Sequence, residues 1–427
     1  MTQPQRLPLS GLRVLEFCDV WIGPTLCSYM ADAGAEVWKI ETLKRMSRTR
    51  GNGIRPGSGP MYPNCEPGAR PWNRSAYYNV HNRNKLGFTL DVSEKRGREL
   101  YLQMVSLCDI VIENFSTHVM PQLHIGYDDL RAVRPDIIMV SLSPYGQTGP
   151  YKDHTTYGFS LDSMSGHASL RGYPDQDMSQ VDPAYPQDQA GVHTAIFAAL
   201  TAVRHRLTTG QGQWIDLSQT EAFMDHIGEQ VLGYSMSGRT PRPVGNQHQS
   251  MAPHGAYPCL GVDRWVTIAV ATDEEWRNLC RLMGNPTWAN SPKFATAPGR
   301  YQNRSELDTH LAEWTSRRHD YETMKLLQGA GVRCTVVMDA SQIHSDEHLR
   351  ARGFFQSAPH VDAGTHDYPG RAWKFSNADM RIVRPPNTLG EHNSLLFREY
   401  LGLSPEAMAS LEKGSGVGTE FLPGADR

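Results

Sequence analysis

The first forty residues of the chain carry the pattern that decides the fold. Residues 13–17 read RVLEF, residues 25–33 read TLCSYMADA, and residues 35–40 read AEVWKI. The first and third stretches are apolar enough for buried strands. The middle stretch predicts a helix, with Pro24 suited to its first turn and Gly34 to its end. A strand, a helix and a strand within about 30 residues predict a βαβ unit with parallel strands.

The same alternation continues through the first half of the chain. Expected helices occupy residues 94–107, 127–133 and 188–207, and expected strands occupy residues 86–90, 109–113, 137–141 and 214–217. Apolar strands that alternate with helices predict an α/β fold whose parallel sheet is covered on both faces. Ligands of such sheets bind beyond the carboxyl ends of the strands. The segments that leave those ends are residues 18–23, 114–117 and 142–150.

The pattern changes after about residue 230. Residues 241–255 are rich in Pro, Gly, Asn and His, as expected of a linker or loop. Strands at 265–270 and 332–337 with helices at 273–283 and 305–314 then predict a second, smaller α+β domain. From about residue 353 strand-like runs and a last helix at 393–401 are expected to return to the first domain.

Composition excludes several classes of protein. The 427 residues contain 42 Lys and Arg against 45 Asp and Glu, a formal charge of −3, which argues against a nucleic-acid partner. No run of 18 apolar residues predicts a membrane span, and the polar N-terminus lacks the apolar core of a signal peptide, so the cytoplasm is expected. Seven cysteines without a CxxC pair and 17 histidines without HExxH predict neither a disulfide scaffold nor a metal site.

Four features are candidates for chemistry. The turn after the first strand lacks GxGxxG, which argues against a nicotinamide or flavin cofactor. Residues 82–85 (NRNK) either hold phosphates or form a solvated turn, and the glycines of residues 143–150 either approach a ligand or form an ordinary tight turn. Asp188 is either an N-cap or a nucleophile.

Together these segments resemble the class III CoA-transferases, the family of formyl-CoA transferase, carnitine CoA-transferase and α-methylacyl-CoA racemase. The resemblance follows family order over nearly the whole chain. It is carried by residues 9–16 (LSGLRVLE), 23–24, 31–41 (ADAGAEVWKIE), 82–85, 113–115 (ENF), 145–150 (YGQTGP), 165–166 and 389–392 (LGEH).

The resemblance implies a fold and an assembly. A large Rossmann-like domain would comprise residues 1–230 and 353–427, with a small domain at 241–332 and linkers at 231–240 and 333–352. Two ring-shaped chains of this kind would interlock as a homodimer; a heteromer with a related subunit stays open. The family's glycine-rich lid would correspond to residues 245–249 (GNQHQ).

The resemblance also implies site residues. The family's nucleophile matches Asp188, and CoA would be bound as a substrate rather than as a permanent cofactor. The positions that match its CoA contacts are Trp21, Ile22, Asn82, Arg83, Asn84, Lys85, Asn114, Phe115, Ser116 and Tyr157. Trp21, Thr42 and Ser116 depart from the residues common in relatives, and Arg45, Arg48 or Arg50 are alternatives for holding phosphates.

The implied activity is transfer of CoA from an acyl-CoA to a free carboxylic acid through an aspartyl-CoA thioester. Backbone amides at Gly146–Gly149 or at Gln189 and Ala190 are candidate oxyanion donors. Aromatic and apolar residues at positions 21, 157, 159 and 164 favour a bulky acceptor. Two alternatives remain: a racemase, which Tyr157 disfavours because that branch has a histidine nearby, and a CoA-binding subunit without turnover.

Overall fold

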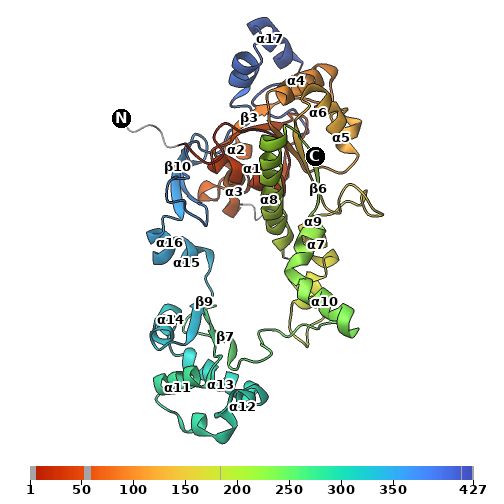
Figure 1. Cartoon of the computed structure of the whole chain (residues 1–427). Coiled ribbons are helices and arrows are strands. Elements are labelled where there is room, and N and C mark those ends of the chain that lie inside the picture. Colours follow the sequence, from red (N-terminus) through yellow and green to blue (C-terminus); the bar gives the residue numbers. More distant parts are fainter. Residues whose placement is uncertain (1–5, 52–58, 183, 415, 426–427) are drawn as a thin grey trace. The chain divides into compact units, whose positions relative to one another are not determined.

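The computed structural model describes residues 6–51, 59–182, 184–414 and 416–425 (Figure 1). The chain divides into two compact units. The first comprises Met1–Gly166, Pro183–Val231 and Arg350–Arg427, and the second comprises His167–Asp182 and Leu232–Leu349. Residues 167–182 thus group with the second unit, whereas the sequence placed them in the large domain.

A six-stranded parallel sheet forms the centre of the first unit, as the strand and helix pattern predicts. Its strands, in spatial order, are β3 (Leu86–Thr89), β2 (Glu36–Glu41), β1 (Arg13–Phe17), β4 (Ile110–Glu113), β5 (Ile138–Ser143) and β6 (Trp214–Ser218). The order 3-2-1-4-5-6 is that of dinucleotide-binding sheets, and it reverses between β1 and β4. A ligand is expected beyond the carboxyl ends of β1 and β4, where this reversal occurs.

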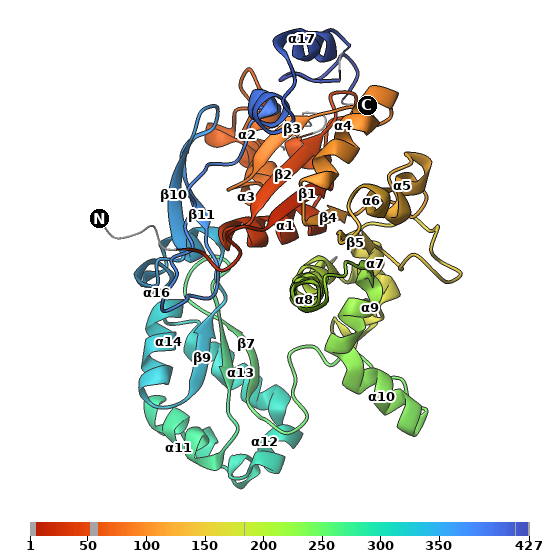
Figure 2. The same cartoon turned by 45° about the horizontal axis from the view of Figure 1, so that its top comes forward.

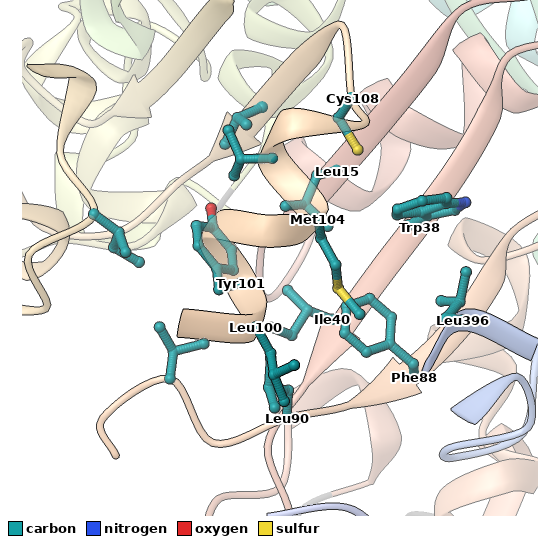
Figure 3. Packing of buried hydrophobic residues seen from close by; sticks show 14 of the residues in the cluster. Leu15, Trp38, Ile40, Phe88, Leu90, Leu100, Tyr101, Met104, Cys108 and Leu396 are labelled. Atoms are coloured by element: carbon teal, nitrogen blue, oxygen red, sulfur yellow. The ribbon is translucent and has the colours of Figure 1, made fainter. Parts of the chain in front are cut away.

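Alternating side chains of each strand enter two separate cores. Val14 and Val37 face helices α1 (Ile22–Asp32) and α8 (Pro186–Thr209). Their neighbours Leu15 and Trp38 face the opposite core, which Figure 3 shows packed with Phe88, Leu100 and Met104 among others. Helices α4 (Lys95–Ser106), α5 (Val119–Gln122), α6 (Tyr127–Val133) and α17 (Pro405–Lys413) contribute to this second core (Figure 2).

The C-terminal tail contains strands, as its strand-like runs predict, whereas the stretch at 45–82 contains short helices that the sequence analysis does not predict. The stretch contains η1 (Arg48–Arg50), α2 (Pro71–Arg74) and α3 (Ala76–His81). The tail forms a hairpin of β10 (Phe355–His360) and β11 (Gly364–Pro369), and the expected last helix is a π-helical turn at Leu395–Tyr400. Between β5 and β6 lies α7 (Gly158–Met164), and after β6 come α9 (Gln219–Met224) and α10 (Gly228–Ser237).

The second unit is an α+β structure with its own core. Its antiparallel sheet has the order β7 (His254–Pro258), β8 (Trp265–Ala269), β9 (Arg333–Val336). The core includes side chains of α11 (Asp273–Leu282), α13 (Arg304–Thr315) and α14 (Asp320–Gly329). None of the helices in the described residues is long and apolar enough to cross a membrane.

Candidate active site

The connections that leave β1 and β4 meet at the point where the strand order reverses. The Asn114 side chain accepts a hydrogen bond from the Asp19 amide (2.9 Å) and donates one to the Asp19 carbonyl (2.7 Å). Val20 has a φ of 60°, a costly conformation for a β-branched residue. A Cβ on Gly23 would lie 2.3 Å from the sulfur of Cys18, so only glycine fits there. Close packing and the Asn114 bridge therefore fix this edge of the site.

Asp188 is the third residue of α8. The N-cap position is Tyr185, so the N-cap interpretation of Asp188 is wrong. The preceding Gln187 is buried and donates from its side-chain amide to Asp162 Oδ1 (3.0 Å) and Ser165 Oγ (3.1 Å). These bonds anchor the first turn of α8 to α7 and fix the direction of the Asp188 side chain.

The Asp188 carboxylate is half-buried and unpaired. In the part of the chain that the structure describes, no hydrogen bond or ion pair reaches it. Burial raises its pKa to about 6. Asp162, in contrast, is 2 % exposed and holds Gln187, so it is not accessible to a substrate. An ionised carboxylate that no protein donor stabilises is a good nucleophile, because no such bond must break before it attacks.

Aromatic side chains surround this carboxylate. The Trp21 ring lies 6.1 Å from both Tyr77 and Tyr185 and 5.7 Å from His81, measured between ring centroids. Burial, followed by the charge of Asp188, raises the pKa of Tyr77 to about 12, so its hydroxyl keeps its proton at neutral pH. The Trp21 indole N–H is buried without a partner among the described residues. The site thus offers two neutral donors, and the carboxylates of both Asp188 and Asp19 act on the Tyr77 hydroxyl.

The other positions that the sequence predicts as CoA contacts, Ile22, Phe115, Ser116 and Tyr157, lie in or near the connections that follow β1, β4 and β5. Ile22 begins α1 and contacts the helix at Gly191, where a Cβ would lie 2.5 Å from the Ile22 Cδ1. Phe115 packs edge-on against Phe17 at 4.7 Å, and the Ser116 carbonyl accepts from the Val119 amide. Tyr157 is the N-cap residue of α7 and is exposed, as are Phe159 and Met164.

The cluster Asn82–Lys85 is not a phosphate site in this structure. Arg83 is 1 % exposed and paired with Asp32, and Lys85 is 0 % exposed and paired with Glu16. The side chains of the two asparagines are also hydrogen-bonded within the fold. Asn82 accepts from the Lys85 ammonium and donates to the Tyr78 carbonyl. Asn84 donates to Asp32 and accepts from the amides of Val383 and Arg384. Both interpretations from the sequence, a phosphate cradle or a solvated turn, fail because the cations are neutralised inside the fold.

Three of the expected oxyanion donors, the amides of Gln147, Gln189 and Ala190, bond within the fold. The Gln147 amide donates to both carboxylate oxygens of Asp216 (2.9 and 3.0 Å). With Tyr185 as N-cap, the amides of Gln189 and Ala190 lie beyond the helix start and bond within α8. The unpaired first-turn amides near the nucleophile are those of Gln187 and Asp188 themselves.

Comparison with known proteins decides the family. The model of CoA-transferase family III matches residues 9–393. The chain belongs to CoA-transferase family III. The resemblance that the sequence motifs indicate is therefore confirmed.

Relatives of this family III CoA-transferase cover it almost completely. Succinyl-CoA–D-citramalate CoA-transferase of Chloroflexus aurantiacus is 30 % identical, over 95 % of this chain and 97 % of the relative. Succinate–glutarate CoA-transferase of Agrobacterium fabrum is 28 % identical, over 92 % and 95 %. A CAIB/BAIF family structure from Brucella suis has a TM-score of 0.83 and 29 % identity, over 92 % of this chain and all of that chain.

The sequence analysis missed three residues of the site and did not anticipate a contact of a fourth. Tyr77, Tyr185 and Gly158 went unassigned because nothing in their local sequence distinguishes them from loop residues. Arg48 was named only as an alternative phosphate ligand, yet its guanidinium lies 4.4 Å over the Tyr157 ring. Among the described residues, no group of three or more His, Cys, Asp or Glu side chains is arranged to hold a metal.

Proposed function

We propose that the chain moves CoA from an acyl-CoA to a free carboxylic acid through a thioester on Asp188. The observation that carries this proposal is the Asp188 carboxylate at the first turn of α8, which is partly exposed and has no hydrogen-bond or ion-pair partner among the described residues. Membership of CoA-transferase family III supports transfer of CoA in general. The site chemistry supports the covalent route.

Each step exchanges one carboxyl derivative for another. The Asp188 oxygen attacks the thioester carbonyl and expels CoA thiolate, which leaves a mixed anhydride on the enzyme. The thiolate attacks the Asp188 carbonyl, forms the aspartyl-CoA thioester and releases the donor acid as its carboxylate. The acceptor carboxylate then attacks this thioester and expels the thiolate. Attack of the thiolate on the acceptor carbonyl yields the new acyl-CoA and frees Asp188.

The neutral hydrogen-bond donors of the site can stabilise the negative charge that develops in these steps. Every tetrahedral intermediate carries an oxyanion, which fixed donors in a half-buried site stabilise strongly. The Tyr77 hydroxyl and the Trp21 indole N–H are such donors, and neither bears a charge that would pair permanently with Asp188. We propose them in place of the amides of Gln147, Gln189 and Ala190, which bond within the fold.

The racemase alternative lacks support from this site. Racemisation requires a base on each face of the α-carbon of the acyl group, and Asp188 supplies at most one of them. His81 is the histidine of the aromatic group, but burial lowers its pKa to about 3, and Thr25 contacts its Nδ1 at 2.9 Å. A base with so low a pKa is a poor proton acceptor at neutral pH. A non-catalytic subunit, the other alternative, would not require the unpaired Asp188.

CoA itself is proposed to lie along the edge formed by the strand ends. Because Arg83 and Lys85 are neutralised, we retain as its proposed contacts Trp21, Ile22, Asn114, Phe115, Ser116 and Tyr157. We also propose that the chain acts as an interlocked homodimer, as the family resemblance implies. Exposed apolar side chains on α8, Phe197 at 75 % and Leu207 at 74 %, are consistent with a covered surface.

The covalent intermediate is the test of this function. Incubation with an acyl-CoA alone is expected to add the mass of CoA to the protein, because no acceptor is present to discharge it. Hydroxylamine should cleave the adduct, and borohydride should reduce the thioester carbonyl to an alcohol at Asp188. Peptide mass spectrometry checks the position. Asp182→Asn, which changes an exposed carboxylate, is the matched control and should still form the adduct.

Other outcomes would overturn either the assigned residue or the covalent route. An adduct on another carboxylate would keep the covalent route and overturn the choice of Asp188. Transfer of CoA without any adduct, at short reaction times, would overturn the covalent route itself.

The pH dependence of kcat/KM should reflect the raised pKa of Asp188. The nucleophile must be ionised, so kcat/KM should be constant above pH 7 and fall about tenfold per pH unit below about 6. Tyr77, whose pKa is about 12, does not change charge in this range, and free carboxylic acids titrate at lower pH, about 4. The pH profile of kcat/KM measures the inflection. An inflection near 4 would mean that Asp188 is fully solvated.

A further inference from the structure

Arg48 is a cation of the active site that no carboxylate of the described chain neutralises. It begins η1 and is exposed, with its guanidinium stacked 4.4 Å over the Tyr157 ring. Arg50, two residues later in the same turn, is buried and bonded through two nitrogens to both oxygens of Glu41, each at 2.6 Å. In this turn, Arg50 is therefore structural, whereas the charge of Arg48 is available to bind an anionic ligand.

The Arg48 guanidinium and the Asp188 carboxylate lie near the same residues. Tyr157, which Arg48 covers, is followed directly by Gly158, and a Cβ on Gly158 would lie 3.1 Å from Asp188 Oδ2. Both charges, together with that of the Asp19 carboxylate, also act on the hydroxyl of Tyr77. The surroundings of Asp188 therefore include the Arg48 cation and the rings of Tyr157 and Tyr77.

The chemistry of the transfer limits what this cation can bind. The phosphates of CoA are separated from its sulfur by the long pantetheine arm, so when the sulfur reacts at Asp188 they lie well away from it. A monocarboxylic acid brings one carboxylate, which is consumed in forming the anhydride. A second carboxylate on the same acid is the anion that would reach Arg48, and the planar guanidinium matches its two oxygens.

We propose that Arg48 binds the distal carboxylate of a dicarboxylic acid whose other carboxylate reacts at Asp188. This inference rests on the proposed CoA-transferase function. The rings of Tyr157 and Tyr77 form the walls that contact the methylene groups between the two carboxylates. Stacking on Tyr157 orients the guanidinium before the acid binds, which lowers the entropy cost of forming the pair.

The test compares acids that differ only in the distal charge. The isolated CoA–enzyme thioester is discharged with glutarate, with its monoamide glutaramate, and with butyrate. For the wild type, glutarate should react at least about tenfold faster in kcat/KM than glutaramate, a difference of about 1.4 kcal/mol. Arg48→Gln should remove this preference by slowing glutarate about 10- to 100-fold, with the other two acids changed less than about threefold.

Two further variants separate charge from packing. Arg48→Lys keeps the charge without the planar fork and should retain part of the preference for glutarate. Arg131→Gln removes an exposed cation of α6 and should behave as the wild type. Equal slowing of all three acids by Arg48→Gln, no slowing of any, or a raised KM for the acyl-CoA alone would each overturn the distal carboxylate site.

Binding without turnover keeps the inference testable if the covalent route fails. Glutarate should raise the melting temperature of the wild type, and Arg48→Gln should abolish most of that shift, while glutaramate has little effect on either. Absence of a thioester in the wild type would refute the proposed function. Absence of a glutarate shift that depends on Arg48 would refute the distal carboxylate site.

Discussion

Asp188→Asn is expected to lose CoA transfer by at least about a thousandfold, a barrier increase of about 4 kcal/mol, while the protein folds normally. The amide has nearly the same shape as the carboxylate, but it is a poor nucleophile and forms no anhydride. The measurement is transfer of CoA to a labelled acid, with Asp188→Ala as a second variant because deamidation of Asn would restore Asp. Retention of a tenth of the wild-type kcat would refute the nucleophile assignment.

The same substitution is expected to stabilise the fold, with a defined dependence on pH. Burial raises the pKa of Asp188 from 3.8 to about 6, so the folded state disfavours its ionised form. This penalty is absent below pH 3.8, grows between 3.8 and about 6, and is complete above that. A shift of about two units corresponds to at most about 3 kcal/mol, and partial solvent exposure reduces it to about 1–3 kcal/mol.

Urea unfolding of the wild type and Asp188→Asn checks this at about pH 8 and at about pH 4. The variant should be the more stable protein at the higher pH and equal to the wild type at the lower one. A variant that is less stable at about pH 8 would show that the carboxylate makes a stabilising contact. Stability gained on loss of activity is the behaviour expected of a strained catalytic group.

The second large effect is expected at the buried charges beneath the site. Glu16 is 0 % exposed and lies 2.7 Å from Lys39 Nζ and 2.6 Å from Lys85 Nζ. Glu16→Gln would leave two buried ammonium groups without their shared counter-charge. We expect a loss of about 3–5 kcal/mol in the free energy of unfolding, enough to unfold many domains. Chemical denaturation at neutral pH measures it.

The control is Lys85→Met, which removes one cation and leaves Glu16 paired with Lys39 alone. Its loss should be smaller than that of Glu16→Gln, although the bonds from Lys85 to Pro24 O and Asn82 Oδ1 are lost. The two lysines lower the pKa of Glu16 despite its burial, so its stabilisation is present at neutral pH and is lost in acid. An equal loss in both variants would mean that packing rather than charge dominates.

The buried ion pairs around residues 82–85 help to position the elements of the site. Asp32 at the end of α1 binds Arg83 and also Arg371 of the C-terminal tail (2.6 Å). Lys85 donates to the carbonyl of Pro24 in the first turn of α1. These contacts hold the start of α1, and with it Trp21, against the strand ends. A change at Arg83 or Lys85 is therefore expected to act through stability rather than through the KM for CoA.

The sequence by itself determined the sheet, its parallel strands and the position of Asp188 near the start of α8. Those features depend on the spacing of apolar residues along short stretches, which reports directly which side of an element is buried. The helix at Tyr127–Val133 has the predicted bounds, and β1 at Arg13–Phe17 does as well. The family motifs carried the nucleophile assignment, because an aspartate at a helix start is otherwise an ordinary cap.

Only the tertiary structure decided what the charged residues do. Arg48 and Arg50 are indistinguishable in the sequence SRTR, yet Glu41 at the end of β2 neutralises Arg50 alone. Likewise Arg83 and Lys85 read as surface cations until Asp32 and Glu16, distant in the chain, are brought against them. The physical reason is that local patterns record burial, whereas the partner of a charge is set by contacts between segments far apart in the sequence.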